Sequence, residues 1–336
     1  MKRKSLILAA WAALGILWTA GLSAKSPDND VKMFPIKQNG KWGYINQQGQ
    51  VVIAPQFEEA KTFSEGLAAV KQNGKWGYAD KSGKPVIAPQ FEDTGWFSEG
   101  RAVVTVKVNE ASKEGYIDRT GKLVIPAQYS YVQPFSEGLA PVLAGEVQEA
   151  WGFIDKTGKP VIKAEYEDAY GFQQGLAPVG RDGKWGFINK SGKFVIPQKY
   201  DWAYGFNQDR AEVDLGKFCG YVDKAGKEVI PPKYEECGIF SEALARVQAN
   251  GKYGFIDKSG KVVIEPQYES AGTFYSGLTF IKVGDKYGFI DKTGKIVIDP
   301  KFSKIGSYSQ GISGVWVGNK LGYIEPTGKY IWEPTE

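Results

Sequence analysis

Few side chains in this 336-residue sequence have the types needed for catalysis or metal binding. There is no histidine, which removes the commonest general base, the commonest metal ligand and any Ser-His-Asp triad. Ser-Gly-Lys and Thr-Gly-Lys triplets recur, but never within Gly-x4-Gly-Lys-Ser/Thr, so they do not indicate a phosphate-binding loop. The sequence therefore predicts no catalytic residue, no metal site and no cofactor.

Carboxylates are present, but they recur at fixed places in a repeated pattern. One precedes a glycine-containing turn and is Asp80, Asp118, Asp155, Asp223, Asp257 or Asp291, with Asn46, Asn189 and Glu325 in its place elsewhere. A catalytic acid needs one special environment, whereas a residue found in nearly every copy suits hydrogen bonding to a turn backbone. The glutamate of a Phe-Ser-Glu-Gly motif (Glu65, Glu99, Glu137, Glu242) becomes Gln174, Gln208 and Gln310 elsewhere. We therefore expect hydrogen bonding or solvent exposure for this second group, because its role survives the loss of charge.

The only two cysteines are Cys219 and Cys237. An even number in an oxidising compartment permits a disulfide, and two small buried thiols are the alternative. A separation of 18 residues does not decide between them, since a disulfide also requires a suitable Cα distance. Two cysteines without histidine are a poor zinc ligand set.

Residues that break the repeat are the best candidates for binding. Arg101 and Arg210 replace a leucine found in other copies, and a charge there must reach solvent, a carboxylate or a partner. Extra aromatic residues stand in consecutive copies at Trp96, Tyr131, Tyr170, Trp202 and Tyr204. They suit a carbohydrate or protein surface, or they fill gaps between the copies.

The elements that position these residues follow from an internal repeat. An invariant glycine recurs at Gly43, Gly77, Gly115, Gly152, Gly186, Gly220, Gly254, Gly288 and Gly322. Six of the eight steps are 34 residues, and the other two are 38 and 37. All the extra length lies just before the glycine, within residues 105–114 and 143–150, as expected for loops on one face of a repeat protein.

Each copy reads as a small antiparallel sheet. In residues 57–88, a short segment is followed by an alternating strand, an Asn-Gly turn, a strand around Trp76, a second turn and a Val-Ile strand. This predicts a three-stranded meander with a short fourth strand, which needs its neighbours to bury both faces.

The pattern Gly-Lys-Trp-Gly-Tyr, Asp-Lys-Thr-Gly-Lys, Val-Ile-x-Pro and Phe-Ser-Glu-Gly-Leu-Ala resembles the bacterial WG (KWG) repeat family over residues 33–334, in nine units. The resemblance implies a repeat with a presumed role in interactions and a relation to β-propellers. We expect an all-β, propeller-like array, with an open β-superhelix as the alternative. Nine meanders but eight short first segments would leave one meander outside an eight-bladed ring, and no blade is split between the chain ends.

The N-terminus reads as an export signal. Basic residues at positions 2–4 precede an uncharged apolar stretch that ends in Ser23 and Ala24. We expect a signal peptide over 1–24, cleaved after Ala24 or Ser23, a linker over 25–32 and the repeat domain over 33–336. An uncleaved membrane anchor is the alternative. Removing residues 1–24 lowers the formal charge from +4 to +1, which does not favour nucleic-acid binding.

These observations favour an exported, non-enzymatic scaffold in the periplasm, at the cell surface or secreted, with a protein or an envelope polymer as partner. A lectin-like glycan binder that uses the extra aromatic residues is the second hypothesis. A carboxylate-based glycosidase is the third, and the lack of an acidic pair outside the repeat counts against it.

Overall fold

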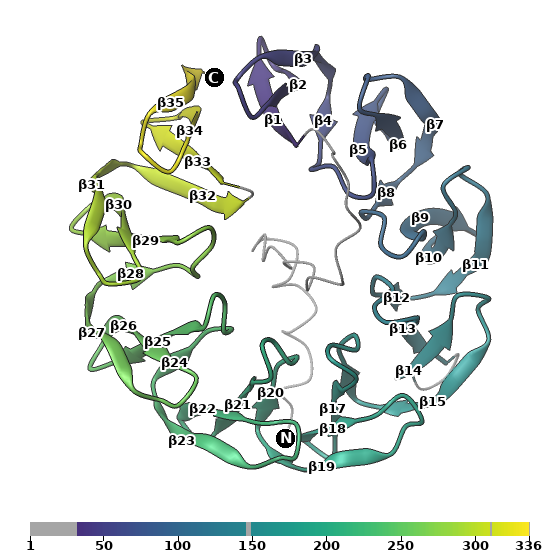
Figure 1. The fold of residues 1–336 in the computed structure, drawn as a ribbon. Coiled ribbons are helices and arrows are strands. Elements are labelled where there is room, and N and C mark those ends of the chain that lie inside the picture. The colour runs from purple at the N-terminus through teal and green to yellow at the C-terminus, as the bar shows by residue number, and fades with distance from the viewer. Residues whose placement is uncertain (1–31, 146–148, 310, 336) are drawn as a thin grey trace.

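The computed structural model describes residues 32–145, 149–309 and 311–335. In these ranges every regular element is a β-strand, and the strands form nine antiparallel sheets. Figure 1 shows the sheets arranged as the blades of a ring, numbered here from blade 1 to blade 9 along the chain. The predicted propeller is therefore confirmed.

The first three blades span Met33 to Tyr129. Blade 1 contains β1 (Met33–Gln38), β2 (Lys41–Asn46) and β3 (Val51–Phe57). Blade 2 contains β4 (Glu59–Ala60), β5 (Leu67–Gln72), β6 (Lys75–Asp80) and β7 (Pro85–Phe91). Blade 3 contains β8 (Asp93–Thr94), β9 (Ala102–Val108), β10 (Ala111–Ile117) and β11 (Leu123–Tyr129).

The next three blades repeat this plan. Blade 4 contains β12 (Tyr131–Val132), β13 (Leu139–Ala144), β14 (Ala150–Asp155) and β15 (Pro160–Tyr166). Blade 5 contains β16 (Asp168–Ala169), β17 (Ala177–Arg181), β18 (Lys184–Ile188) and β19 (Phe194–Tyr200). Blade 6 contains β20 (Trp202–Ala203), β21 (Ala211–Leu215), β22 (Phe218–Val222) and β23 (Glu228–Tyr234).

The last three blades complete the ring. Blade 7 contains β24 (Glu236–Cys237), β25 (Leu244–Ala249), β26 (Lys252–Asp257) and β27 (Val262–Tyr268). Blade 8 contains β28 (Ser270–Ala271), β29 (Leu278–Val283), β30 (Lys286–Asp291) and β31 (Ile296–Phe302). Blade 9 contains β32 (Lys304–Ser309), β33 (Ile312–Val317), β34 (Lys320–Ile324) and β35 (Tyr330–Thr335). The short fourth strand expected from the sequence is the first strand of blades 2–8.

Turn chemistry gives the ring two distinct faces. The turns between the second and third strands of a blade, such as Asn73-Gly74, lie at the same end as the links to the next blade. The carboxylate of Glu58 in one such link accepts hydrogen bonds from the N–H groups of Asn73 and Gly74, at 3.0 Å each. We call this end the Asn-Gly face. The opposite end, with the Phe-Ser-Glu-Gly turns and the turns that follow the third strands, is the Ser-Glu-Gly face.

The core lies between blades rather than within one. Trp76 and Tyr78 of blade 2 share a buried cluster with Phe97, Ala102 and Val104 of blade 3. The Tyr78 and Phe97 rings lie 4.8 Å apart, and equivalent ring pairs recur around the ring. Each blade therefore depends on its neighbours for burial, as expected for a repeat array.

The invariant glycine marks both a bulge and a close backbone approach. At Gly77 the pairing of β6 with β7 shifts register, from Trp76 opposite Phe91 to Tyr78 opposite Ile87. A Cβ atom on Gly77 would lie 2.4 Å from the carbonyl oxygen of Ile87, which is too close for any side chain. A glycine within a strand commonly marks a bulge or a close approach by a neighbouring backbone, and here it marks both, which explains why the glycine never varies.

The ring closes between blade 9 and blade 1 without sharing a strand. The Tyr323 hydroxyl donates to the Pro35 carbonyl at 2.6 Å, and the Phe34 and Tyr323 rings lie 5.8 Å apart. The equivalent tyrosine of blade 1, Tyr44, donates to the carbonyl of Lys61, which follows the short first strand of blade 2, at 2.7 Å. The open-superhelix alternative is therefore wrong. All nine meanders are used, since blade 1 joins the ring without a short first strand among the described residues.

Candidate functional site

The recurring aspartates are turn-forming residues, as predicted. One carboxylate oxygen of Asp80 accepts hydrogen bonds from the N–H groups of Ser82 and Lys84, at 2.8 and 3.1 Å, and from the Ser82 hydroxyl. These bonds, the Ser82 hydroxyl first, hold the pKa of Asp80 below its usual value. The amide oxygen of Asn189 accepts the equivalent bonds from Ser191 and Lys193, so the turn does not need a charge.

The glutamates of the Phe-Ser-Glu-Gly motif join neighbouring blades. The Glu65 carboxylate in blade 2 accepts a hydrogen bond from the Gly100 N–H in blade 3, at 3.0 Å. Gln174 makes the equivalent bond to the Asp209 N–H with its amide oxygen, at 2.9 Å. The prediction of a hydrogen-bonding role that survives loss of charge is confirmed. These residues have a structural role, because they link neighbouring blades.

Arg101 and Arg210 lie on the Ser-Glu-Gly face, where each bonds to main-chain carbonyls. Arg210 donates to Lys258 in the next blade, at 3.3 Å, and to Asp209, at 2.9 Å. Arg101 donates to the Gly100 carbonyl at 3.1 Å. Arg210 precedes Asp214, the cross-strand partner of Trp202, by four residues, which places it about 13 Å along the strand. Arg210 therefore does not share a site with Trp202.

Three of the five extra aromatic residues do gather in one place. Tyr170 stacks on Trp185 with ring centroids 5.6 Å apart, and Trp185 lies 4.5 Å from Trp202. Tyr204 extends the cluster from Trp202 at 6.4 Å. Tyr170 and Trp185 are buried between blades 5 and 6, whereas Tyr204 is 39% exposed. The inner part of this cluster fills a gap between blades, and its outer edge reaches solvent.

The other two extra aromatic residues stand apart. Tyr131 is 46% exposed and contacts Trp151 edge to face, with centroids 5.8 Å apart. Trp96 is 38% exposed and has no ring contact or hydrogen bond with any other described residue. Both side chains are therefore open to solvent, without belonging to the Tyr170–Tyr204 cluster.

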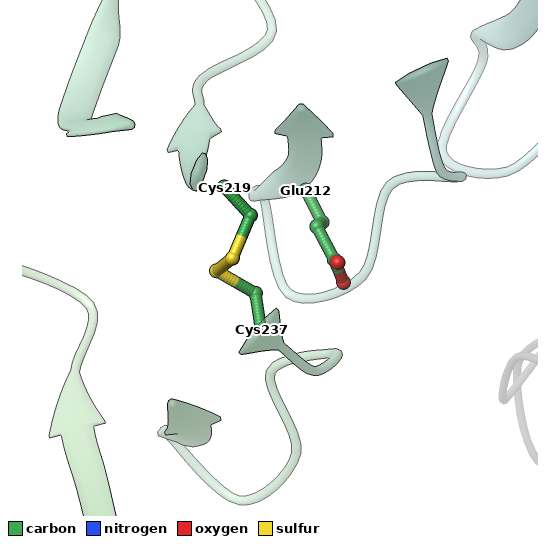
Figure 2. A group of neighbouring side chains, drawn as sticks. All are labelled: Glu212, Cys219 and Cys237. Carbon is green, nitrogen blue, oxygen red and sulfur yellow. A yellow bond between two sulfur atoms is a disulfide. The ribbon is translucent and has the colours of Figure 1, made fainter. Parts of the chain in front are cut away.

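A disulfide joins Cys219 of β22 in blade 6 to Cys237 of β24 in blade 7, with the Cα atoms 6.0 Å apart (Figure 2). The pairing that the sequence left open is thus made across a blade interface. Cys219 occupies the position of Trp185, and Cys237 that of the small Ala203 which Trp185 packs against in the preceding interface. The covalent bond replaces aromatic packing at this point of the ring.

A pocket of about 380 Å³ lies at the Asn-Gly face beside this disulfide. Its walls come from blade 6, from the Gly216-Lys217 turn and from the start of blade 7 and its second strand. It is lined by Tyr204, Glu212, Asp214, Gly216, Lys217, Phe218, Cys219, Glu235, Glu236, Cys237 and Arg246. Two cysteines fill less volume than the Trp–Ala pair of the neighbouring interface, which accounts for space at this interface.

Two carboxylates of the pocket have no hydrogen-bond or ion-pair partner among the described residues. Glu212 and Asp214 alternate along β21 and therefore point to the same side of the blade. Burial raises the pKa of Glu212 to about 8, and the nearby charge of Asp214 adds to the shift. Burial, followed by the charge of Asp201, raises the pKa of Asp214 to about 6. Figure 2 shows the Glu212 carboxylate beside the disulfide.

Three other charged groups of the pocket, Glu235, Glu236 and Arg246, are engaged elsewhere. Glu235 accepts hydrogen bonds from the N–H groups of Asn250 and Gly251, and Glu236 accepts one from the Tyr253 hydroxyl. The Arg246 guanidinium donates to the Ala271 carbonyl at 2.8 Å and lies over the Tyr253 ring. Arg246 attracts Glu212 through space but forms no ion pair with it, so the Glu212 carboxyl group has no direct partner in the pocket.

Sulfur and carboxylate atoms of Glu212, Cys219 and Cys237 lie within 4.8 Å of one another. This is close enough to share a metal ion. While the sulfur atoms are bonded to each other, however, neither provides the thiolate that a metal requires. In the disulfide form the group is therefore a pocket wall.

Sequence reasoning missed Glu212 and Asp214. A signal was available for Glu212: its position in the second strand holds Ala69, Val103, Pro141 and Pro178 in blades 2–5, which makes a carboxylate there an exception. The second exception, Glu114, holds the tryptophan position of blade 3. It accepts a hydrogen bond from the Val132 N–H at 2.8 Å, and burial raises its pKa to about 7.

The architecture defines a β-propeller built from tandem copies of one unit. The sequence profile described as WG containing repeat matches eight consecutive segments: residues 42–76, 76–107, 115–146, 151–185, 185–217, 220–253, 253–287 and 287–320. Together they cover well over half of the sequence, and the chain belongs to the WG-repeat family. The family predicted from the sequence is thus confirmed.

Solved structures are similar to this chain at low sequence identity. One described as the crystal structure of the eukaryotic initiation factor is similar with a TM-score of 0.65 and 13% identity, covering 91% of this chain and 96% of that chain. Apo AztD from Citrobacter koseri is similar with a TM-score of 0.43 and 11% identity, covering 91% and 95%. At 13% identity the first likeness shows the fold alone. No curated protein sequence matches this chain.

The expected signal peptide over 1–24 and most of the linker over 25–32 lie outside the described residues. Within the described ranges, no helix has the length and apolar character needed to cross a membrane.

Proposed function

We propose that this WG-repeat propeller is an exported, non-enzymatic scaffold whose Asn-Gly face binds a protein or a polymer of the cell envelope. One observation carries the proposal: several departures from the repeat lie on that face of blades 3–7, whereas Arg101 and Arg210 lie on the opposite face. The Tyr204 edge of the aromatic cluster, the pocket beside the disulfide and the extended β9–β10 hairpin all lie there. The opposite face carries the inter-blade hydrogen bonds of the repeated Glu and Gln residues. Function in repeat proteins concentrates where surface loops and side chains vary.

Export is proposed from the basic and apolar pattern of residues 1–24, and a disulfide suits an oxidising compartment. Expression of the full chain in a bacterium, followed by cell fractionation and N-terminal sequencing, tests this. We expect the protein outside the cytoplasm with a new N-terminus at Ala24 or Lys25. Full-length protein that stays in the cytoplasm would contradict export.

Binding is tested by capture from an envelope extract. Shortening the β9–β10 hairpin by four residues and the β13–β14 connection by three gives both the length found in the other blades. We expect the shortened protein to lose its captured partner. Arg210→Leu, which restores the repeat residue on the Ser-Glu-Gly face, is the matched control and should leave capture unchanged. Equal capture by the shortened protein would show that the hairpins are not part of the binding surface.

Glycan binding is a second candidate, because Trp96, Tyr131 and Tyr204 expose aromatic surface. A glycan array should then show selective binding that disappears in Tyr131→Ala combined with Tyr204→Ala. A flat array would eliminate this candidate. Turnover of any arrayed glycan by the purified protein would contradict the non-enzymatic role.

A further inference from the structure

We propose that the pocket between blades 6 and 7 binds an alkylammonium or guanidinium group, supplied by a lysine or arginine side chain of the partner protein. This inference deepens the proposed function and rests on it, because it assigns the chemistry by which the Asn-Gly face recognises its partner. The argument depends on the pocket, on its two uncompensated carboxylates and on its aromatic walls.

The volume of the pocket fits a side chain rather than a bare ion. A space of about 380 Å³ falls within the range of small-molecule sites. A hard metal ion would need six or more oxygen ligands at short distance. The clustered groups of Glu212, Cys219 and Cys237 offer one carboxylate and two sulfur atoms that are bonded to each other. An elongated organic cation fills such a space and needs fewer, more widely placed oxygens.

The charges of the pocket select a cation. Glu212 and Asp214 have no hydrogen-bond or ion-pair partner among the described residues, and Lys217 and Arg246 do not pair with them. A buried carboxylate without a partner is costly, and an ammonium or guanidinium group between these two would remove that cost. Neither cation of the pocket pairs with them: Arg246 is held against Ala271 and Tyr253, and Lys217 lies in the exposed turn at the edge of the pocket.

The aromatic residues suit the same ligand. Tyr204 and Phe218 line the pocket and are 39% and 46% exposed. Aromatic faces attract ammonium and guanidinium groups and pack against the methylene stem of lysine or arginine. A protein side chain is favoured over a free polyamine because the pocket opens at the Asn-Gly face, beside the exposed Gly216-Lys217 turn, where a polypeptide can lie across the mouth.

The test measures binding of defined probes to the purified, disulfide-bonded protein by isothermal titration calorimetry. The probes are the peptide acetyl-Gly-Ser-Lys-Lys-Ser-Gly-amide, the same peptide with both lysines Nε-acetylated, and free agmatine and spermidine. We expect the lysine peptide to bind and the acetylated peptide to bind about tenfold more weakly or not at all. Tighter binding of the free amines than of the peptide would overturn the assignment to a protein side chain.

Variants locate the binding in the pocket. Glu212→Gln keeps the shape and removes the carboxyl group that ionises against a bound cation, and should weaken binding of the lysine peptide by about tenfold or more. Asp168→Asn is the matched control, because Asp168 is also a partly buried carboxyl group whose pKa burial raises to about 6, but it does not line the pocket. Cys219→Trp combined with Cys237→Ala rebuilds the Trp–Ala pair of the neighbouring interface and should abolish binding by filling the space.

Unchanged affinity in Glu212→Gln, or equal loss in Asp168→Asn, would overturn the proposal. Failure of the cation pocket and failure of the proposed function give different experimental results. If shortening the hairpins abolishes partner capture but the lysine peptide does not bind, the scaffold role stands and the cation pocket does not. If the peptide binds but partner capture is unchanged by shortening the hairpins, the hairpins are not part of the binding surface and the pocket chemistry stands.

Discussion

Two neighbouring blade interfaces place different side chains at equivalent positions. Between blades 5 and 6, Trp185 is only 5% exposed and packs in one cluster with Ala203 and Phe206. Between blades 6 and 7, Cys219 and Cys237 form a disulfide instead, and a pocket with two uncompensated carboxylates lies beside it. A large aromatic residue holds blades together by filling space, whereas a covalent bond holds them together and leaves space free. The second interface can therefore carry a binding site without losing its attachment.

The largest expected effect comes from truncating the aromatic interface. Trp185→Ala removes a buried indole between blades 5 and 6 and should lower the free energy of unfolding by about 3–5 kcal/mol. Thermal unfolding followed by circular dichroism measures the loss. Trp96→Ala, at a site that is 38% exposed, is the control and should lower stability by clearly less than Trp185→Ala. An unchanged melting temperature in Trp185→Ala would show that the tryptophan does not hold the blades together.

Reduction of the disulfide should have the next largest effect. Closing an 18-residue separation contributes about 3 kcal/mol by restricting the unfolded chain. Dithiothreitol should therefore lower the melting temperature of the wild-type protein. It should leave Cys219→Trp combined with Cys237→Ala unaffected, since that variant holds the same interface by packing. If reduction lowered both melting temperatures equally, the disulfide would not be the cause.

The pH dependence of stability distinguishes the two interfaces through Glu212. Its pKa is about 8 in the folded protein and near 4.5 in the unfolded chain, so the folded state holds a proton that the unfolded state has lost. The stabilising contribution of the protonated group is complete below about pH 4.5 and is lost as the pH rises to about 8. Glu212→Gln should match the wild type at pH 4 and exceed its stability at pH 9 by about 1–3 kcal/mol. Equal stability of the two proteins at pH 9 would contradict the pKa shift, which also depends on Asp214, Glu236 and Arg246.

The smallest effect is expected where every blade is alike. Asp80→Asn should change stability by less than about 0.5 kcal/mol, because Asn46 and Asn189 form the same turn with an amide oxygen. Asp80→Ala removes the acceptor and should cost about 0.5–1.5 kcal/mol. Thermal melts of the two variants measure the difference. Equal losses in both variants would mean that the turn requires the charge.

The sequence was sufficient to predict the roles of residues that recur in every blade. The turn role of Asp80, the hydrogen-bonding role of Glu65 and the bulge at Gly77 follow from patterns seen many times, because a residue needed in each blade reveals its role by recurring, although the pattern did not show that Glu65 bonds to the next blade. Ring closure was harder to predict, since it depends on the rotation from one blade to the next, which no single unit specifies. The meeting of Glu212 with the disulfide was hidden for another reason. It joins residues from two blades, at an interface where three repeat positions change at once.

The closing contact between blades 9 and 1 also has a consequence for the way this molecule opens. The chain itself connects all the remaining pairs of adjacent blades, and the disulfide adds a second covalent link between blades 6 and 7. The seam at Tyr323 and Pro35 has side-chain and backbone contacts alone. Thermal fluctuations should therefore part the ring at the seam first, and amide hydrogens of β1 and β34 should exchange with deuterium sooner than those of β22 and β25. The ring therefore has one non-covalent closure, between blades 9 and 1, and this closure lies three blades away from the disulfide-linked interface.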